Sequence, residues 1–383
     1  MSITKSVIGC VAGVLIADGS LEPDLPAAHY VPELAYGSCA HVSVRDLLDM
    51  RTAGTAHPED YIDPHGELAR IAAAVEEPWP GLPAPLPGAH APATLRDVVA
   101  TAVLPPAPTP APAPPPPPVA LDPVPLDPAP LDVATPHQPP SPLDTAASPE
   151  ASGEQSPLPP TSPTSPTPPA TARPFCYRSL DTEALAWVLE RAAGRPILDL
   201  VAELLAPLQL EAPGSIAIDA TGVPQASGGL GLRARDVARF ALMVLHGGAA
   251  GETQVVPSTF VKDTRTGGPD SAEAMLARVD HVLGPGAGLA ARGGLYRNQF
   301  WVPSKGARAL LCLGIHGQLA LVDNDTDTVV VKLSTWPTAQ NPVHFTDGLT
   351  CAQTIAHHLG GRDPSARRGR AASAPAPLPS RSP

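Results

Sequence analysis

The chain begins Met1-Ser2-Ile3-Thr4-Lys5-Ser6-Val7-Ile8-Gly9-Cys10, and this stretch decides how the rest of the sequence is interpreted. Apolar residues recur behind it at helical spacing as far as residue 18, which predicts a buried helix that begins near Ser2. Ser2 and Lys5 are three residues apart, so the hydroxyl and the amine share one helix face and the amine can accept the hydroxyl proton. The start of a helix also favours an anionic centre. The pattern therefore indicates a serine nucleophile with its own lysine base.

Two other interpretations fit the same stretch. Lys5 and the apolar run that contains Cys10 resemble a lipoprotein signal peptide. However, only four residues separate Lys5 from Cys10, which is too few for the apolar core of such a signal. The stretch could also be an ordinary core helix that a serine caps. Partners for Ser2 and Lys5 elsewhere in the chain would decide in favour of the nucleophile.

The middle of the chain has a composition that cannot form a packed core. The sequence has 383 residues, of which 53 are proline, and residues 105–172 consist largely of Pro, Ala, Thr and Ser with repeated Leu-Asp-Pro. Such a segment predicts a disordered insertion with polyproline II character, more in keeping with a solvated spacer than with a ligand for an aromatic groove. The basic tail at 361–383 is similar. We expect residues 1–104 and 173–360 to form the two parts of one folded domain.

The net charge and the cysteine content limit which binding partners and which cellular compartment we expect. The net charge is -12, which argues against nucleic acid and anionic membrane surfaces as partners, and no apolar run reaches the length of a membrane-spanning helix. Five widely spaced cysteines predict reduced packing residues in a cytoplasmic protein. The residues His57, Asp60, Asp63 and His65 match no defined zinc or calcium loop, so we expect neither a metal nor a cofactor. The sequence contains no pattern that predicts an oligomeric state.

Periodicity predicts helices first and strands last. A capping box is expected at Ser43 and Asp46, and helices are expected at 181–193, where Asp181 would be the cap, at 196–205 and at 237–245. Short apolar or alternating runs predict strands at 299–302, 309–313, 318–322 and 328–333, followed by a helix near 352–359. This order predicts an α+β fold in which an antiparallel sheet is flanked by helices.

Three motifs occur in an order that resembles a known family. Ser-x-x-Lys at 2–5 is followed by Tyr177-Arg178-Ser179 ahead of a helix pair, and then by Gly314-Ile315-His316-Gly317-Gln318 at a strand end. This order resembles the class C β-lactamase-like serine hydrolases, above all their 6-aminohexanoate-dimer hydrolase-type amidases and esterases. The resemblance covers residues 1 to about 104 and 173 to about 360, and implies a β-lactamase/penicillin-binding-protein-like fold. In that family strands of the sheet precede the nucleophile helix, so we expect this chain to lack those first strands.

The resemblance also implies roles for individual residues. Ser2 would be the acylated nucleophile, Lys5 its base, and Tyr177 the group that relays a proton to the leaving group. The backbone N–H groups of Ser2 and Ile315 would form the oxyanion hole. Ser179 stands where the wider family has an asparagine, and its hydroxyl can still hydrogen-bond.

The third motif departs from the family pattern. Cys312-Leu313-Gly314 stands where the family has Lys-Thr-Gly, with His316 two residues on, and this favours a small-molecule amide or ester over a β-lactam as the substrate. Gly314 and His316 are expected beside the substrate, and Tyr61 falls in the loop that lines the cleft in such hydrolases. An alternative of another class stays open: a truncated, catalytically silent remnant of the fold that acts as a binding or interaction protein and displays the proline-rich arm.

Overall fold

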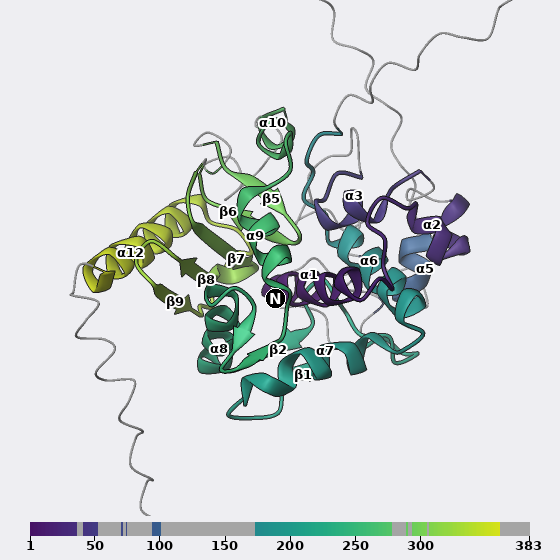
Figure 1. Cartoon of the computed structure of the whole chain (residues 1–383), viewed down its shortest axis with the longest axis horizontal. Coiled ribbons are helices and arrows are strands. Elements are labelled where there is room, and N and C mark those ends of the chain that lie inside the picture. The colour runs from purple at the N-terminus through teal and green to yellow at the C-terminus, as the bar shows by residue number, and fades with distance from the viewer. Residues whose placement is uncertain are drawn as a thin grey trace, which may run out of the picture. The chain divides into compact units, whose positions relative to one another are not determined.

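The computed structural model describes residues 1–36, 41–52, 70–71, 74, 94–100, 173–277, 289, 293–304 and 306–360 (Figure 1). The expected insertion at 105–172, the tail at 361–383, Tyr61 and the His57 to His65 region lie outside the described residues. The helices and helical turns are α1 Ile3–Ala17, α2 Ala27–Tyr30, η1 Pro32–Tyr36, α3 Val44–Leu48, α5 Leu95–Ala100, α6 Ser179–Ala193, α7 Ile197–Leu205, η2 Ala206–Leu208, α8 Ala234–Leu245, α9 Ser258–Thr266, α10 Ser271–Leu276, η4 Ile315–Gly317 and α12 Pro342–Gly360.

The main sheet has five antiparallel strands in the order β5-β6-β7-β8-β9. The strands are β5 Leu295–Arg297, β6 Phe300–Val302, β7 Ala309–Gly314, β8 Gln318–Asp323 and β9 Thr328–Lys332. Two small hairpins pair β1 Ser215–Ile216 with β2 Leu230–Gly231 and β3 Ala249–Ala250 with β4 Thr253–Gln254. The four predicted strands are confirmed, and β5, which is three residues long, was not predicted. All five strands of the described sheet follow residue 294, and the predicted α+β class is confirmed.

The two faces of the sheet belong to two different hydrophobic clusters. Because successive strand residues point to opposite faces, Leu310 and Cys312 of β7 pack into the larger cluster, with α1 and α8, whereas Leu311 and Leu313 pack into a smaller cluster with α12. Both α8 and α12 contact β8 and β9, and Figure 1 shows α12, in yellow, on the side of the sheet away from α8. The sheet is therefore covered by helices on both faces, which explains why its strands are almost continuously apolar.

Helix α1 lies in the larger cluster, where Ile8 and Ala12 are fully buried. It is held close to the turn between β5 and β6 by Gly9, at which an added Cβ would lie 2.3 Å from the carbonyl oxygen of Asn298. Ser6 Oγ donates to the carbonyl oxygen of Gln299 at 2.9 Å, and both turn residues have positive φ, as a two-residue hairpin turn requires. The first helix and the sheet are thus fixed to each other at this turn.

Helix α6 begins two residues earlier than the sequence predicts, at Ser179. Asp181 does not cap it: the Asp181 carboxylate is fully buried and accepts hydrogen bonds from Thr52 Oγ1 at 2.7 Å. Arg178, the largest fully buried side chain, donates to the same threonine at 3.1 Å and lies 3.5 Å from the Asp181 carboxylate. The hydrogen bonds of Thr52 link this buried ion pair at the start of α6 to the segment after α3 and fix the first turn of α6 in the core.

The cysteines behave as expected with one exception. Cys10, Cys176 and Cys312 are buried, and Cys39 lies outside the described residues. Cys351 on α12 is exposed, so the prediction that it is a packing residue is wrong. In the part of the chain that the structure describes, no helix combines the length and the apolar character that a membrane crossing requires.

Candidate active site

Lys5 is the centre of a buried polar cluster. The residue is 1% exposed, and its amine donates to Ser2 Oγ at 3.1 Å, to Ser179 Oγ at 2.9 Å and to the carbonyl oxygen of Ser227 at 2.7 Å. The three acceptors come from α1, from the first turn of α6 and from the loop before β2. Residues that are up to 225 positions apart in the sequence therefore meet at one amine, and two of them, Ser2 and Ser179, were expected there.

Ser2 occupies the N-cap position of α1 without acting as a cap. Its side chain makes no capping hydrogen bond, and the residue is 6% exposed. The hydroxyl instead faces the Lys5 amine. The interpretation of this stretch as an ordinary helix with a capping serine is therefore wrong, because the serine oxygen is committed to the lysine rather than to the backbone.

Tyr177 lies on the other side of the Lys5 amine. Its ring centroid is 5.2 Å from Nζ, which is within the range of a cation–π contact. The ring is stacked on Trp301, with centroids 5.2 Å apart, and meets Tyr296 edge to face at 6.0 Å. These aromatic neighbours from β5 and β6 hold the Tyr177 ring beside the Lys5 amine.

The end of β7 reaches the beginning of α1. A Cβ added to Gly314 would lie 3.0 Å from Met1 Cβ, so the strand end is beside the residue that precedes Ser2. Ile315, which follows Gly314, is 5% exposed. Gly314 therefore lies beside the start of α1, and the oxyanion hole of Ser2 and Ile315 stays a prediction.

His316 is held by the loop that follows β9. Its Nδ1 lies 2.7 Å from the carbonyl oxygen of Trp336, and since a carbonyl only accepts, Nδ1 carries the proton. The backbone N–H of His316 donates to the carbonyl of Ala339 at 2.9 Å, and its φ is 58°. Among the described residues, no hydrogen bond joins His316 to Ser2 or Lys5. The imidazole therefore anchors the turn between β7 and β8.

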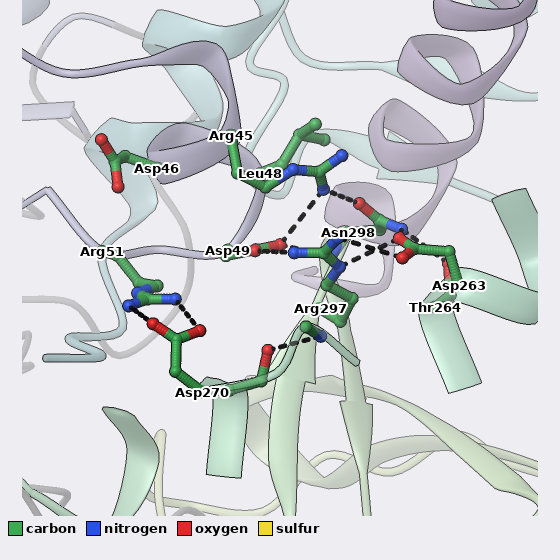
Figure 2. Close-up of polar contacts among 12 residues, drawn as sticks. Arg45, Asp46, Leu48, Asp49, Arg51, Asp263, Thr264, Asp270, Arg297 and Asn298 are labelled. Atoms are coloured by element: carbon green, nitrogen blue, oxygen red, sulfur yellow. Dashed lines mark hydrogen bonds and ion pairs between the residues drawn. The ribbon is translucent and has the colours of Figure 1, made fainter. Parts of the chain in front are cut away.

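A network of ion pairs supports the site from behind the β5–β6 turn (Figure 2). Asp49, at the end of α3, accepts from Arg297 Nη1 at 2.6 Å and from the backbone N–H of Asn298 at 3.0 Å. Arg297 also forms two hydrogen bonds to Asp263 of α9, at 2.9 and 3.0 Å. Burial raises the pKa of Asp49, against the opposing charges of Arg45 and Arg297. The network joins α3, α9 and the sheet around the turn that contacts α1.

A cavity of about 450 Å³ also touches α1. At the beginning of the helix it is lined by Met1, Ile3, Thr4 and Val7. Apolar side chains of β2 and α8, such as Leu230 and Phe240, complete the wall. Met1 precedes Ser2 and Gly228, which also lines the cavity, follows Ser227, so the cavity extends to residues adjacent to the Lys5 cluster.

Two parts of the cluster were not predicted from the sequence. One is the carbonyl of Ser227, in a glycine-rich turn that we did not connect with Lys5. The other is Glu183 of α6, which is 5% exposed and accepts from the backbone of residues 226–227. Its position four residues after Ser179, and hence on the same helix face, is the signal that could have identified it.

Comparison with known proteins gives relatives of one kind. A family model described as Beta-lactamase matches residues 1–111. The 6-aminohexanoate-dimer hydrolase of Paenarthrobacter ureafaciens is 30% identical over 338 residues, which are 88% of this chain and 66% of that protein. The chain therefore spans slightly less than two thirds of the length of this curated relative.

Solved structures agree with this result on the fold. A proposed 6-aminohexanoate-dimer hydrolase from Bacillus anthracis has a TM-score of 0.62 at 21% identity and covers 94% of this chain and 72% of its own. A family VIII carboxylesterase has a TM-score of 0.52 at 13% identity, with 92% of this chain and 82% of its own covered. At such identities the likeness concerns the fold alone. Taken with the match of residues 1–111 to the Beta-lactamase model and the curated relative, it makes this chain similar to hydrolases of the beta-lactamase fold.

Proposed function

We propose that the chain is a serine hydrolase that acts on linear amides or carboxylic esters through an acyl-enzyme. The observation that supports this most directly is the 3.1 Å distance between Lys5 Nζ and Ser2 Oγ in a buried position. Withdrawal of an ammonium from water costs free energy, which favours the neutral amine that a base must be. A neutral lysine can donate to Ser179 and to the Ser227 carbonyl while its lone pair faces the Ser2 hydroxyl.

The reaction would proceed in two stages. Ser2 Oγ attacks the carbonyl carbon of the substrate as its proton passes to Lys5, and the negative oxygen that forms is stabilised by the backbone N–H groups of Ser2 and Ile315. The proton then passes by way of Tyr177 to the leaving amine or alcohol, and the bond to the leaving group breaks. Water, deprotonated by the same base, hydrolyses the ester of Ser2 and releases the acid.

The names of the similar proteins support this substrate class. They include a 6-aminohexanoate-dimer hydrolase, a carboxylesterase and a D-stereospecific amidohydrolase from Streptomyces sp.. The first of these names describes cleavage of a linear amide dimer, and the second describes cleavage of an ester. We therefore place linear amides and simple esters first among the candidate substrates of this chain.

Hydrolysis of p-nitrophenyl acetate and of the linear 6-aminohexanoate dimer tests the proposal. Wild type should turn over at least one of them, and Ser2→Ala and Lys5→Ala should each lose that turnover by about 10³-fold or more. Ser20→Ala and Lys262→Ala, which change exposed residues, serve as matched controls and should keep it. Full activity of Ser2→Ala would refute the proposal. A folded wild type without turnover of any ester or amide would favour the catalytically silent binding protein.

A further inference from the structure

Glu183 is a buried acid one helical turn from Ser179 on α6. One carboxylate oxygen accepts from the backbone N–H of Ser227 at 2.8 Å, and the other accepts from that of Ala226 at 3.1 Å. An N–H can only donate, so both oxygens of Glu183 act as acceptors in this arrangement. A buried carboxyl group thus lies against the loop that contacts the lysine.

The same loop connects Glu183 with Lys5. The carbonyl of Ser227 accepts from Lys5 Nζ at 2.7 Å, while the N–H of the same residue donates to Glu183 at 2.8 Å. One residue, Ser227, therefore contacts the carboxyl group of Glu183 through its N–H and the amine of Lys5 through its C=O. Displacement of residues 226–227 would move the carbonyl away from the lysine and change the geometry of the base.

The charges of the two side chains also interact. Burial raises the pKa of Glu183, whereas the hydrogen bonds from residues 226–227 and the charge of Lys5 oppose this effect. The interaction is mutual, because a fixed negative charge stabilises a nearby ammonium relative to the neutral amine. The charge of Glu183 therefore bears on the pH at which Lys5 loses its proton.

We propose that Glu183 is a positioning residue for Lys5: it holds the Ser227 carbonyl against the amine, and its charge sets the pH range in which the amine can serve as a base. The catalytic consequence rests on the proposed hydrolase function. The effect on the charge state of Lys5 does not, because it follows from the contacts alone.

Direct titration of Lys5 tests the effect of Glu183 on the charge state of the lysine separately from its effect on catalysis. Lys5, Lys262, Lys305 and Lys332 are the only lysines in the sequence, so lysine labelled with ¹³C at Cε gives few resonances. Substitution of the other three by arginine, one at a time, assigns the fourth signal to Lys5. The chemical shift of that signal is then followed against pH in wild type and in Glu183→Gln, with the exposed Glu203→Gln as a matched control.

The expected result is a shift of the Lys5 midpoint to lower pH by about one pH unit in Glu183→Gln, since removal of a nearby negative charge favours the neutral amine. Glu203→Gln should leave the midpoint unchanged. Glu183→Asp, which keeps the charge on a shorter side chain, should keep the midpoint near that of wild type. An unchanged midpoint in Glu183→Gln would overturn the proposal, as would equal shifts in the Gln and Asp variants.

The rate of Ser2 modification by a fluorophosphonate, measured against pH, gives the catalytic readout. In Glu183→Gln the acidic limb of this profile should move with the Lys5 midpoint, and in Glu183→Asp the rate should fall while the limb stays in place. If Glu183 only stabilised the fold, both variants would lower the rate without moving the limb. If wild type is not modified while the Lys5 midpoint still moves, the proposed hydrolase function fails and the inference about Glu183 stands.

Discussion

Substitution of Gly9 by alanine tests the contact that fixes the first helix to the sheet. An alanine Cβ at this position would lie 2.3 Å from the carbonyl oxygen of Asn298, whereas ordinary contacts begin at 3.4 Å. The β5–β6 turn would have to withdraw by about 1 Å to relieve this overlap. That movement would also draw the carbonyl of Gln299 away from Ser6 Oγ, which donates to it at 2.9 Å.

The magnitude follows from three terms. Overpacking of a tightly packed interior costs about 1 to 3 kcal/mol, and loss of one neutral hydrogen bond costs about 1 kcal/mol. Alanine is favoured over glycine inside a helix by about 1 kcal/mol, which offsets part of this cost. The free energy of unfolding of Gly9→Ala should therefore fall by about 1 to 3 kcal/mol.

Urea denaturation followed by circular dichroism measures this difference. Gly348→Ala in α12 is the matched control, because its Cβ would approach nothing nearer than Lys332 Cδ at 3.8 Å. The control should be as stable as wild type or more stable by up to about 1 kcal/mol. A Gly9→Ala protein that also gained stability would refute the close packing of α1 on the turn, and with it the described position of Lys5.

Three further predictions concern the site and its support. Tyr177→Phe should lower the rate of ester hydrolysis by about 10²-fold with little change in the free energy of unfolding, since the ring remains and only the proton relay is lost. Asp49→Asn should lower the free energy of unfolding by about 2 to 4 kcal/mol in urea denaturation, because it removes a buried charge that Arg297 contacts at 2.6 Å (Figure 2). The paired hydrogen bonds from Arg51 lower the pKa of Asp270 in the folded protein. The contribution of this ion pair to the free energy of unfolding is therefore complete above about pH 4, the pKa of an unfolded aspartate, and disappears as the pH falls through the lower pKa of the folded state. Asp270→Asn should therefore cost up to about 1 kcal/mol at pH 7 and nothing near pH 2, and an equal loss at both values would contradict this sign.

The strands of the sheet could be predicted because their pattern is local. Residues 309–332 contain three apolar runs separated by short polar connections, and both faces of β7 and β8 are buried, so every position favours a strand. β5 has only three residues, too few for any periodicity to show. The capping box at Ser43 and Asp46 was likewise predictable, since both of its hydrogen bonds lie within one turn.

The beginning of α6 could not be predicted from local rules. An aspartate just inside an apolar run is typical of a helix cap, but Asp181 has a distant partner in Thr52 and a buried neighbour in Arg178. The gain from that buried network exceeds the gain from a cap, and the helix begins at Ser179 instead. Because the helix begins at Ser179, the hydroxyl of this residue faces Lys5. The predicted helix boundary was wrong by two residues, and one of the residues that it left out belongs to the candidate site.

The candidate site could be predicted where order along the chain was informative. Ser2, Lys5, Tyr177 and Ser179 were all identified from short motifs, and the structure brings them together around one amine. Glu183 was not identified from the sequence, because its position in the site depends on the packing of α6 against a loop 43 residues further along the chain. The sequence shows only that Glu183 lies four residues after Ser179, on the same face of the helix, and does not name the loop that it contacts.

The most direct measurement is the intact mass of the purified chain after incubation with a fluorophosphonate, with Ser2→Ala treated in parallel. If the buried Ser2 and Lys5 form a working nucleophile and base, wild type should gain the mass of one adduct, peptide mapping should locate it at Ser2, and Ser2→Ala should gain none. A folded wild-type protein that remains unmodified, or an adduct that persists in Ser2→Ala, would contradict the assignment of Ser2 as the nucleophile.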